Sequence, residues 1–256
     1  MKTKFYYAYC GSKYNEMPEI IKFVNLDNIT DIVEPFCGSC AFTFYIYEQH
    51  KNKYKYHVSD NDNNLIKLLS MIKKNPDNKK QLYDNLMKFK DMTREQWKEI
   101  SKKQEKTLIE YLLMKVYNVK SSQCMNPVGY RSFPKLEKFL KHNPYDDFLK
   151  DVDIKLEDYK HIMEKYKNDN KALLFIDPPY LESSYSLYAQ KQVSNVSSDF
   201  YKYINDYFKT AKCKIIMVLR ALPLIDIVFE QFIKHTYQKK YDLSKKTVNH
   251  IIISNY

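Results

Sequence analysis

Short apolar runs alternate along the chain with segments whose apolar residues recur at helical spacing. Asn63 to Lys73, for example, places Leu65, Leu68, Leu69 and Ile72 on one helical face, and residues 19–26 also read as a helix. Strand character appears in residues 32–36, 55–59, 152–156, 173–176 and 214–219. This alternation predicts an α/β domain with a mostly parallel sheet, and residues 236–241 and 248–254 predict a terminal β-hairpin.

The pattern changes between Lys79 and Leu149, where many basic residues share predicted helices with apolar ones. Residues 108–117 predict a buried helix, and residues 126–131 read as a loop because they contain a proline and a glycine. We therefore predict a mainly helical insertion at residues 79–149, within a domain formed by residues 1–78 and 150–256.

Composition narrows the class of partner. The chain has 256 residues and a net charge of +11, which favours a polyanion such as nucleic acid, although an ordinary lysine-rich surface has the same charge. The basic residues are spread along the chain, which disfavours an anionic membrane as the partner. No apolar run reaches the ~18 residues that cross a bilayer, and no signal peptide is recognisable, so we expect an intracellular protein, cytoplasmic or DNA-associated.

The five cysteines are odd in number and scattered, which argues against a disulfide framework and for a reducing compartment. Cys37 and Cys40 have CxxC spacing, but no second pair and no nearby histidine completes a zinc site. We predict no metal.

The sharpest chemical signal is the apolar run 173–176 followed by Asp177-Pro178-Pro179-Tyr180. The prolines stiffen the turn, so the acid and the ring are held at the carboxyl end of a strand, where open α/β sheets bind ligands. The Asp177 carboxylate and the Pro178 carbonyl can accept hydrogen bonds from an exocyclic amine and stabilise its developing charge. Tyr180 can stack on a flipped-out base. The competing interpretation is a strand that ends in a Pro-Pro turn without a chemical role.

Two earlier segments indicate a nucleoside cofactor. Residues 33–42 read as a strand, a turn of small residues and a helix start, and Gly38 would let the backbone approach a ligand closely. Asp60 ends the next strand, where an acid commonly binds ribose hydroxyls. The two segments follow each other in β-α-β order, so they support one another.

Together with the tetrapeptide, these segments resemble the Dam-type (D12 class, alpha-group) DNA adenine-N6 methyltransferases, and the resemblance covers nearly the whole chain. Residues 9–13 are similar to W-A-G-G-K, 34–40 to E-P-F-x-G-x-G, 59–66 to A-D-I-N-x-D-L-I, 157–159 to G-D-F, and 251–256 to the closing E-L-L-I-x-N-Y strand. Cys40 replaces the second glycine of the cofactor loop, and residues 219–221 stand where the family often has S-N.

The resemblance implies a Rossmann-like methyltransferase fold, with a mostly parallel seven-stranded sheet, a C-terminal antiparallel hairpin and a target-recognition insertion. It implies S-adenosyl-L-methionine as cofactor, with Asp60 on its ribose and Asp158 and Tyr159 on its adenine. The implied cofactor-binding residues are Tyr9, Cys10, Gly11, Lys13, Glu34, Pro35, Phe36, Gly38, Ser39, Asp60, Asp158 and Tyr159. The implied catalytic residues, acting on the N6 amine of a flipped-out adenine, are Asp177, Pro178, Pro179 and Tyr180.

The family places target recognition between the cofactor loop and the tetrapeptide, which here is the lysine-rich insertion. The residues expected to contact double-stranded DNA are Lys120, Ser122, Gln123, Asn126, Tyr130 and Arg131. The resemblance also allows a cognate restriction endonuclease as a partner. The recognition sequence and the oligomeric state are not fixed by the sequence.

Other interpretations stay open. The tetrapeptide serves any exocyclic amine, so RNA adenine or cytosine N4 remains an alternative substrate. A catalytically impaired nucleic-acid-binding relative is another, because Cys40 departs from the cofactor loop. A cytosine-C5 enzyme is disfavoured because no proline precedes a cysteine. Protein glutamine methylation is disfavoured by the net positive charge and by Asp177, where that class usually has asparagine.

Overall fold

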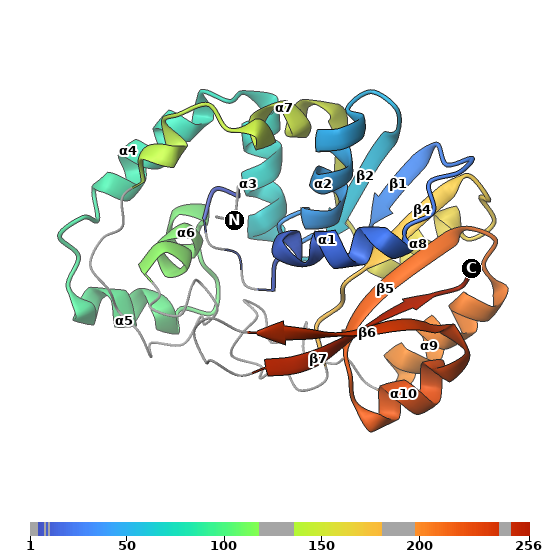
Figure 1. The fold of residues 1–256 in the computed structure, drawn as a ribbon. Coiled ribbons are helices and arrows are strands. Elements are labelled where there is room, and N and C mark those ends of the chain that lie inside the picture. Colours follow the sequence, from blue (N-terminus) through green and yellow to red (C-terminus); the bar gives the residue numbers. More distant parts are fainter. Residues whose placement is uncertain (1–4, 8, 10, 118–135, 181–197, 241–246) are drawn as a thin grey trace.

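A seven-stranded sheet forms the centre of the molecule, with strand order β3-β2-β1-β4-β5-β7-β6 (Figure 1). The computed structural model describes residues 5–7, 9, 11–117, 136–180, 198–240 and 247–256. The strands are β1 (Asp31–Glu34), β2 (Lys55–Asp60), β3 (Val152–Leu156), β4 (Ala172–Ile176), β5 (Lys214–Arg220), β6 (Ile233–Lys240) and β7 (Thr247–Ser254). The first five are parallel, and β7 runs antiparallel to both β5 and β6. This architecture confirms the predicted Rossmann-like methyltransferase fold.

The strand order reverses between β1 and β4. The chain leaves β1 toward β2 and β3 on one side and later fills β4 and β5 on the other. In open α/β sheets, ligands bind outside the carboxyl ends of the strands at such a switch point. The site is therefore expected beyond Glu34 and Ile176, where β1 and β4 end.

Both faces of the sheet are covered, because successive strand residues point to opposite faces. Leu173 and Phe175 belong to one buried cluster, and Leu174 and Ile176 belong to the other. The first cluster is covered by α2 (Ala41–His50), α3 (Asn63–Lys74) and α7 (Pro144–Asp151), and the second by α8 (Tyr159–Tyr166), α9 (Ser198–Thr210) and α10 (Pro223–Phe229). Burial on both faces explains why β4 reads as a continuous apolar run.

The described part of residues 79–149 is mainly helical and extends to one side of the sheet (Figure 1). It contains nearly all of α4 (Asn78–Met87), then α5 (Arg94–Lys102), α6 (Leu108–Tyr117) and the 3-10 helix η3 (Glu137–Phe139), followed by most of α7. Trp97, which is fully buried, lies in the same cluster as Phe42 of α2. The described part of residues 79–149 therefore shares one core with the helices on this face of the sheet.

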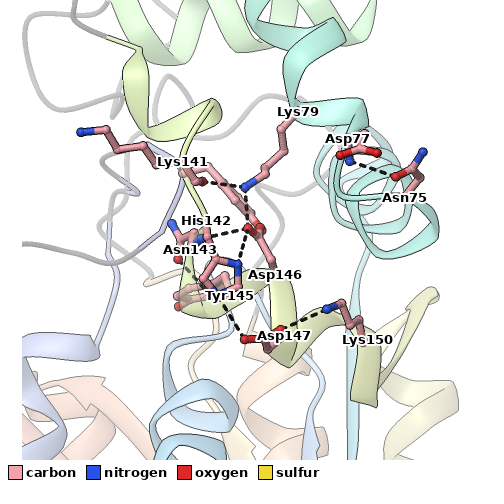
Figure 2. A network of polar contacts seen from close by, with 11 residues as sticks. Asn75, Asp77, Lys79, Lys141, His142, Asn143, Tyr145, Asp146, Asp147 and Lys150 are labelled. Carbon is pink, nitrogen blue, oxygen red and sulfur yellow. Dashed lines mark hydrogen bonds and ion pairs between the residues drawn. The ribbon is translucent and has the colours of Figure 1, made fainter.

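A buried ion pair between Lys79 and Asp146 joins α4 to α7 (Figure 2). The ammonium of Lys79 also donates to the Lys141 carbonyl at 2.9 Å. The Asp146 carboxylate accepts the Tyr6 hydroxyl at 2.7 Å and the Asn143 N–H at 2.9 Å. Three segments far apart in the sequence, the N-terminal segment, α4 and α7, are therefore held by one carboxylate.

The helix predicted at residues 19–26 is shorter and begins earlier. It consists of α1 (Met17–Ile20) and the 3-10 helix η2 (Ile21–Phe23), and Val24 is already extended. Pro18 occupies the first turn of α1, where its missing N–H costs nothing. The end follows from Asn25, whose side chain accepts the N–H of Asp27 at 2.8 Å and so starts a turn toward β1.

Candidate functional site

A cavity lies at the carboxyl ends of β1, β2 and β4, at the switch point of the sheet. Four segments meet there: the N-terminal loop, the turn after β1, the turn after β2 and the Asp-Pro-Pro-Tyr loop after β4. The lining residues are Tyr9, Gly11, Ser12, Lys13, Glu34, Phe36, Cys37, Gly38, Ser39, Ala41, Asp60, Asn61, Asp62, Asp177, Pro178, Pro179 and Tyr180. The fold thus assembles the separate motifs into one site.

The Asp177 carboxylate is held by Lys13. The ammonium of Lys13 lies 2.8 Å from each carboxylate oxygen and also donates to the Gly11 carbonyl at 3.0 Å. Burial raises the pKa of the Asp177 carboxyl above its ordinary value, and the adjacent ammonium opposes that rise. Burial lowers the pKa of Lys13, but Asp177 and Tyr180 outweigh it and the net shift is upward. Lys13 therefore acts directly on the predicted catalytic acid.

The turn after β1 has two residues in the left-handed conformation. Gly38 has φ of 46°, and a Cβ there would lie 2.9 Å from the ring of Tyr9. Cys40, which caps α2, has φ of 52°. A left-handed non-glycine residue costs roughly 1–2 kcal/mol, so the conformation of Cys40, where the family motif has glycine, carries an energetic cost.

Glu34, the last residue of β1, is hydrogen-bonded to the start of α2, which follows this turn. Its carboxylate accepts the backbone N–H groups of Phe42 at 3.4 Å and Thr43 at 3.0 Å, in the first turn of α2. The side chain is 2% exposed, and burial raises its pKa to about 8, although these N–H groups oppose the rise. Glu34 thus fixes where α2 begins relative to β1, and the turn that contains Gly38 lies between them.

Asp60 connects the end of β2 to the same turn. Its two oxygens accept the N–H of Gly38 and the N–H of Asp62, both at 3.0 Å. Burial raises the pKa of Asp60 to about 6, and these two N–H groups oppose the rise. Asp62 in turn caps α3 and accepts the Tyr111 hydroxyl at 3.0 Å. Asp60 and Asp62, which are two residues apart in the sequence, therefore both line the cavity.

Several predicted residues lie beside the cavity and do not line it. Pro35 accepts the Ser59 hydroxyl at 3.4 Å through its carbonyl, and Asp158 caps α8 by accepting the Lys160 N–H at 2.9 Å. Tyr159 stacks on Phe36 with ring centroids 4.9 Å apart, so it lies next to a lining residue. The predicted residues outside the described part of the chain are Cys10, Lys120, Ser122, Gln123, Asn126, Tyr130 and Arg131.

Five lining residues were not among the predicted ones. Each lies within two residues of a predicted residue in one of the motifs, and that proximity in the sequence could have identified them. They are Ser12, Cys37, Ala41, Asn61 and Asp62.

Neither a metal site nor a membrane span is found in the part of the chain that the structure describes. No group of three His, Cys, Asp or Glu side chains there could hold a metal ion. Burial raises the thiol pKa of Cys37. The hydrogen bond with Cys37 lowers the thiol pKa of Cys40, but burial and nearby carboxylates outweigh it, so this pKa is also raised. Among the described helices, none has both the length and the apolar character that crossing a bilayer requires.

Two comparisons with known proteins agree with this geometry. The model of the D12 class N6 adenine-specific DNA methyltransferase family matches residues 9–249. The Type II methyltransferase M.CviBI of Paramecium bursaria Chlorella virus NC1A is 24% identical in an alignment of 266 residues, which covers 96% of this chain and 97% of the viral protein. The family match includes all four segments that form the cavity. This chain belongs to the D12 class N6 adenine-specific DNA methyltransferase family.

Proposed function

We propose that this DNA methyltransferase transfers the methyl group of S-adenosyl-L-methionine to the N6 amine of a flipped-out adenine in double-stranded DNA, at a specific sequence. The observation that carries the proposal is the shared cavity. Asp177, Pro178 and Tyr180 line it together with the Gly38 turn and Asp60. The Asp177 carboxylate, which can accept a hydrogen bond from an amine, thus lines the same cavity as the Gly38 turn, which is suited to a nucleoside.

The charge of the cavity fits the cofactor. With Glu34 holding its proton at neutral pH, the charged lining residues are Lys13, Asp60, Asp62 and Asp177, one cation against three carboxylates, in a chain of net charge +11. S-Adenosyl-L-methionine carries a sulfonium and an ammonium, which such an acidic cavity attracts. Asp60 and the Gly38 turn would hold it, and when bound it supplies an electrophilic methyl carbon.

The chain's own residues act on the amine. The lone pair of an aromatic amine is delocalised, and hydrogen bonds from its N–H groups to Asp177 and to the Pro178 carbonyl favour the pyramidal, nucleophilic nitrogen. Lys13 keeps Asp177 charged and oriented. Tyr180 offers its ring to a base that has left the helix, because adenine inside a duplex is stacked and paired. The nitrogen must then lose one proton, and burial makes Asp177 a better proton acceptor than an exposed carboxylate.

The test is Asp177→Ala, with Asp206→Ala on the exposed side of α9 as a matched control. Each protein is incubated with cofactor labelled in the methyl group and with plasmid DNA, and the modified bases are mapped by sequencing. We expect label on adenine N6 with the wild type and with Asp206→Ala, and none with Asp177→Ala, which should still bind DNA. A wild type that labels no DNA would favour the non-catalytic interpretation, and label on cytosine or only on RNA would favour the other amine substrates.

DNA contacts are proposed for the insertion, because phosphate contacts need basic side chains. Reversing the charge of Lys98, Lys102 and Lys103 on and after α5 should weaken DNA binding and flatten its salt dependence. An unchanged salt slope would place the DNA elsewhere. The designation Type II is that of the viral relative. For this chain, a cognate endonuclease is a further proposal. It is tested by whether plasmid methylated by this protein resists the nucleases in an extract of its host.

A further inference from the structure

The ring of Tyr180 is contacted from two directions by buried polar side chains. The Lys13 ammonium lies 5.2 Å from its centroid, and the imidazole of His250 on β7 meets it edge to face, with centroids 5.7 Å apart and planes at 79°. Lys13 is 3% exposed and His250 is 1% exposed. Two buried groups from opposite ends of the chain therefore define the orientation of this ring.

His250 is itself held by Glu16. The Glu16 carboxylate lies 2.7 Å from Nδ1 of His250, accepts the Tyr237 hydroxyl at 2.6 Å and pairs with the Lys239 ammonium at 3.1 Å. Burial raises the pKa of Glu16, but the bond to His250 and the nearby cations reverse this and lower it to about 2. Tyr237 also packs edge to face on His250, with centroids 5.7 Å apart. The imidazole is thus fixed by a hydrogen bond and by a second aromatic ring.

One short segment, residues 13–16, supports both ends of the Asp-Pro-Pro-Tyr loop, one end directly and the other through His250. Lys13 precedes the 3-10 helix η1 (Tyr14–Glu16) and holds Asp177, while Glu16 ends that helix and holds His250 against Tyr180. The prolines between the two ends stiffen the loop. A shift of His250 would therefore move the ring of Tyr180 relative to the carboxylate of Asp177.

Packing alone does not explain a histidine at this position. The residues that follow on β7 are Ile251, Ile252 and Ile253, all buried, and an aliphatic side chain at residue 250 would continue that run. Burying a polar ring is costly unless it is hydrogen-bonded, and here the partner, Glu16, is a second buried polar group. This arrangement occurs where β7 passes Tyr180.

We propose that His250 is a positioning residue for Tyr180: held by Glu16 and Tyr237, it sets the ring plane on which the target base stacks. The identity of that base rests on the proposed function. The contact itself does not, because it is made within the protein.

The experiment compares His250→Asn and His250→Phe with His50→Asn. His50 ends α2, at the opposite end of that helix from the cavity turn, and its ring packs edge to face on Tyr54 with centroids 5.7 Å apart. His250→Asn removes the ring, whereas His250→Phe keeps a ring but loses the bond to Glu16. We expect His250→Asn to lower kcat on the order of 10-fold, because misplacing a group that orients the substrate is costly. We expect His250→Phe to lie between His250→Asn and the wild type, and His50→Asn to match the wild type.

A spectroscopic measurement separates positioning from loss of stability. With 2-aminopurine in place of the target adenine, emission reports the stacking of the flipped base, and His250→Asn should change it while the affinity for S-adenosyl-L-homocysteine stays the same. Wild-type kcat and emission in His250→Asn, or an equal loss in His50→Asn, would overturn the proposal.

The proposal can fail independently of the proposed function. If the wild type methylates no DNA, hydrogen exchange of the peptide spanning residues 173–180 still tests the contact. Exchange there should be faster in His250→Asn than in the wild type and in His50→Asn. Unchanged exchange would overturn the positioning role, whatever the protein's substrate.

Discussion

Replacing Lys79 with methionine tests how firmly its buried ion pair with Asp146 holds α4 against α7. Lys79 is 5% exposed and its partner Asp146 is 2% exposed (Figure 2). Methionine has a similar length and fills the same space without the charge. The substitution therefore leaves a buried carboxylate without its cation and also removes the hydrogen bond to the Lys141 carbonyl.

The expected cost follows from what remains around Asp146. Removing one partner of a buried ion pair typically costs 3–5 kcal/mol, because the other charge stays buried. Asp146 keeps the Tyr6 hydroxyl and the Asn143 N–H, and the exposed His142 ring lies 3.8 Å away. We therefore expect the lower end, a loss of about 3 kcal/mol in the free energy of unfolding. At 2–4 °C per kcal/mol for a chain of this size, Tm should fall by about 6–12 °C.

Urea denaturation followed by circular dichroism measures this loss. The control is Lys80→Met, one residue along α4, whose exposed ammonium pairs with Asp84 and should change stability by under about 0.5 kcal/mol. Adding Asp146→Asn to Lys79→Met removes the uncompensated charge and should restore part of the loss. If Lys79→Met is no more destabilising than Lys80→Met, the ion pair does not hold these helices together.

Three further predictions concern the cavity. Lys13→Met should reduce methyl transfer about 100-fold, because Lys13 acts on Asp177. Calorimetry should show near-normal affinity for the cofactor. A loss of that affinity would indicate that Lys13 binds the cofactor instead. Affinity for the cationic cofactor should rise as the pH increases through about 6, where Asp60 ionises, and a rise that persists in Asp60→Asn would contradict this. Glu34 has its pKa raised from 4.5 to about 8, so the folded state retains a proton that the unfolded state releases. Stability should therefore fall between those pH values, and melting curves of Glu34→Gln should show a flatter pH dependence.

The local parts of this molecule were predictable from the sequence. The run before Asp177 identified β4 because burial on both faces requires continuous apolar residues. The prolines identified the turn because they restrict the backbone whatever surrounds them. The hairpin was predicted as well, but β6 begins at Ile233 and not near residue 236. Burial alternates along β6 from Ile233, but the three residues after Ile233 are polar, so the sequence does not show an apolar alternation at this end of the strand.

The long-range contacts were not predictable. Lys13 and Asp177 are 164 residues apart, and Glu16 and His250 are 234 residues apart. Nothing in the neighbourhood of either residue in the sequence indicates its partner, because the pairing depends on which strands become neighbours. The resemblance assigned Lys13 to the cofactor, and the structure additionally places it on Asp177, the residue proposed to hold the amine that receives the methyl group.

The position of β7 between β5 and β6 has a consequence for synthesis on the ribosome. β6 leaves the ribosome before β7 but cannot join the sheet without it, so a growing chain carries the open, apolar edge of β5 until residues 247–254 emerge. Such an edge invites aggregation and chaperone binding during translation. Since β7 also brings His250, a truncated product that ends before it lacks both a closed sheet and the support of the Tyr180 ring.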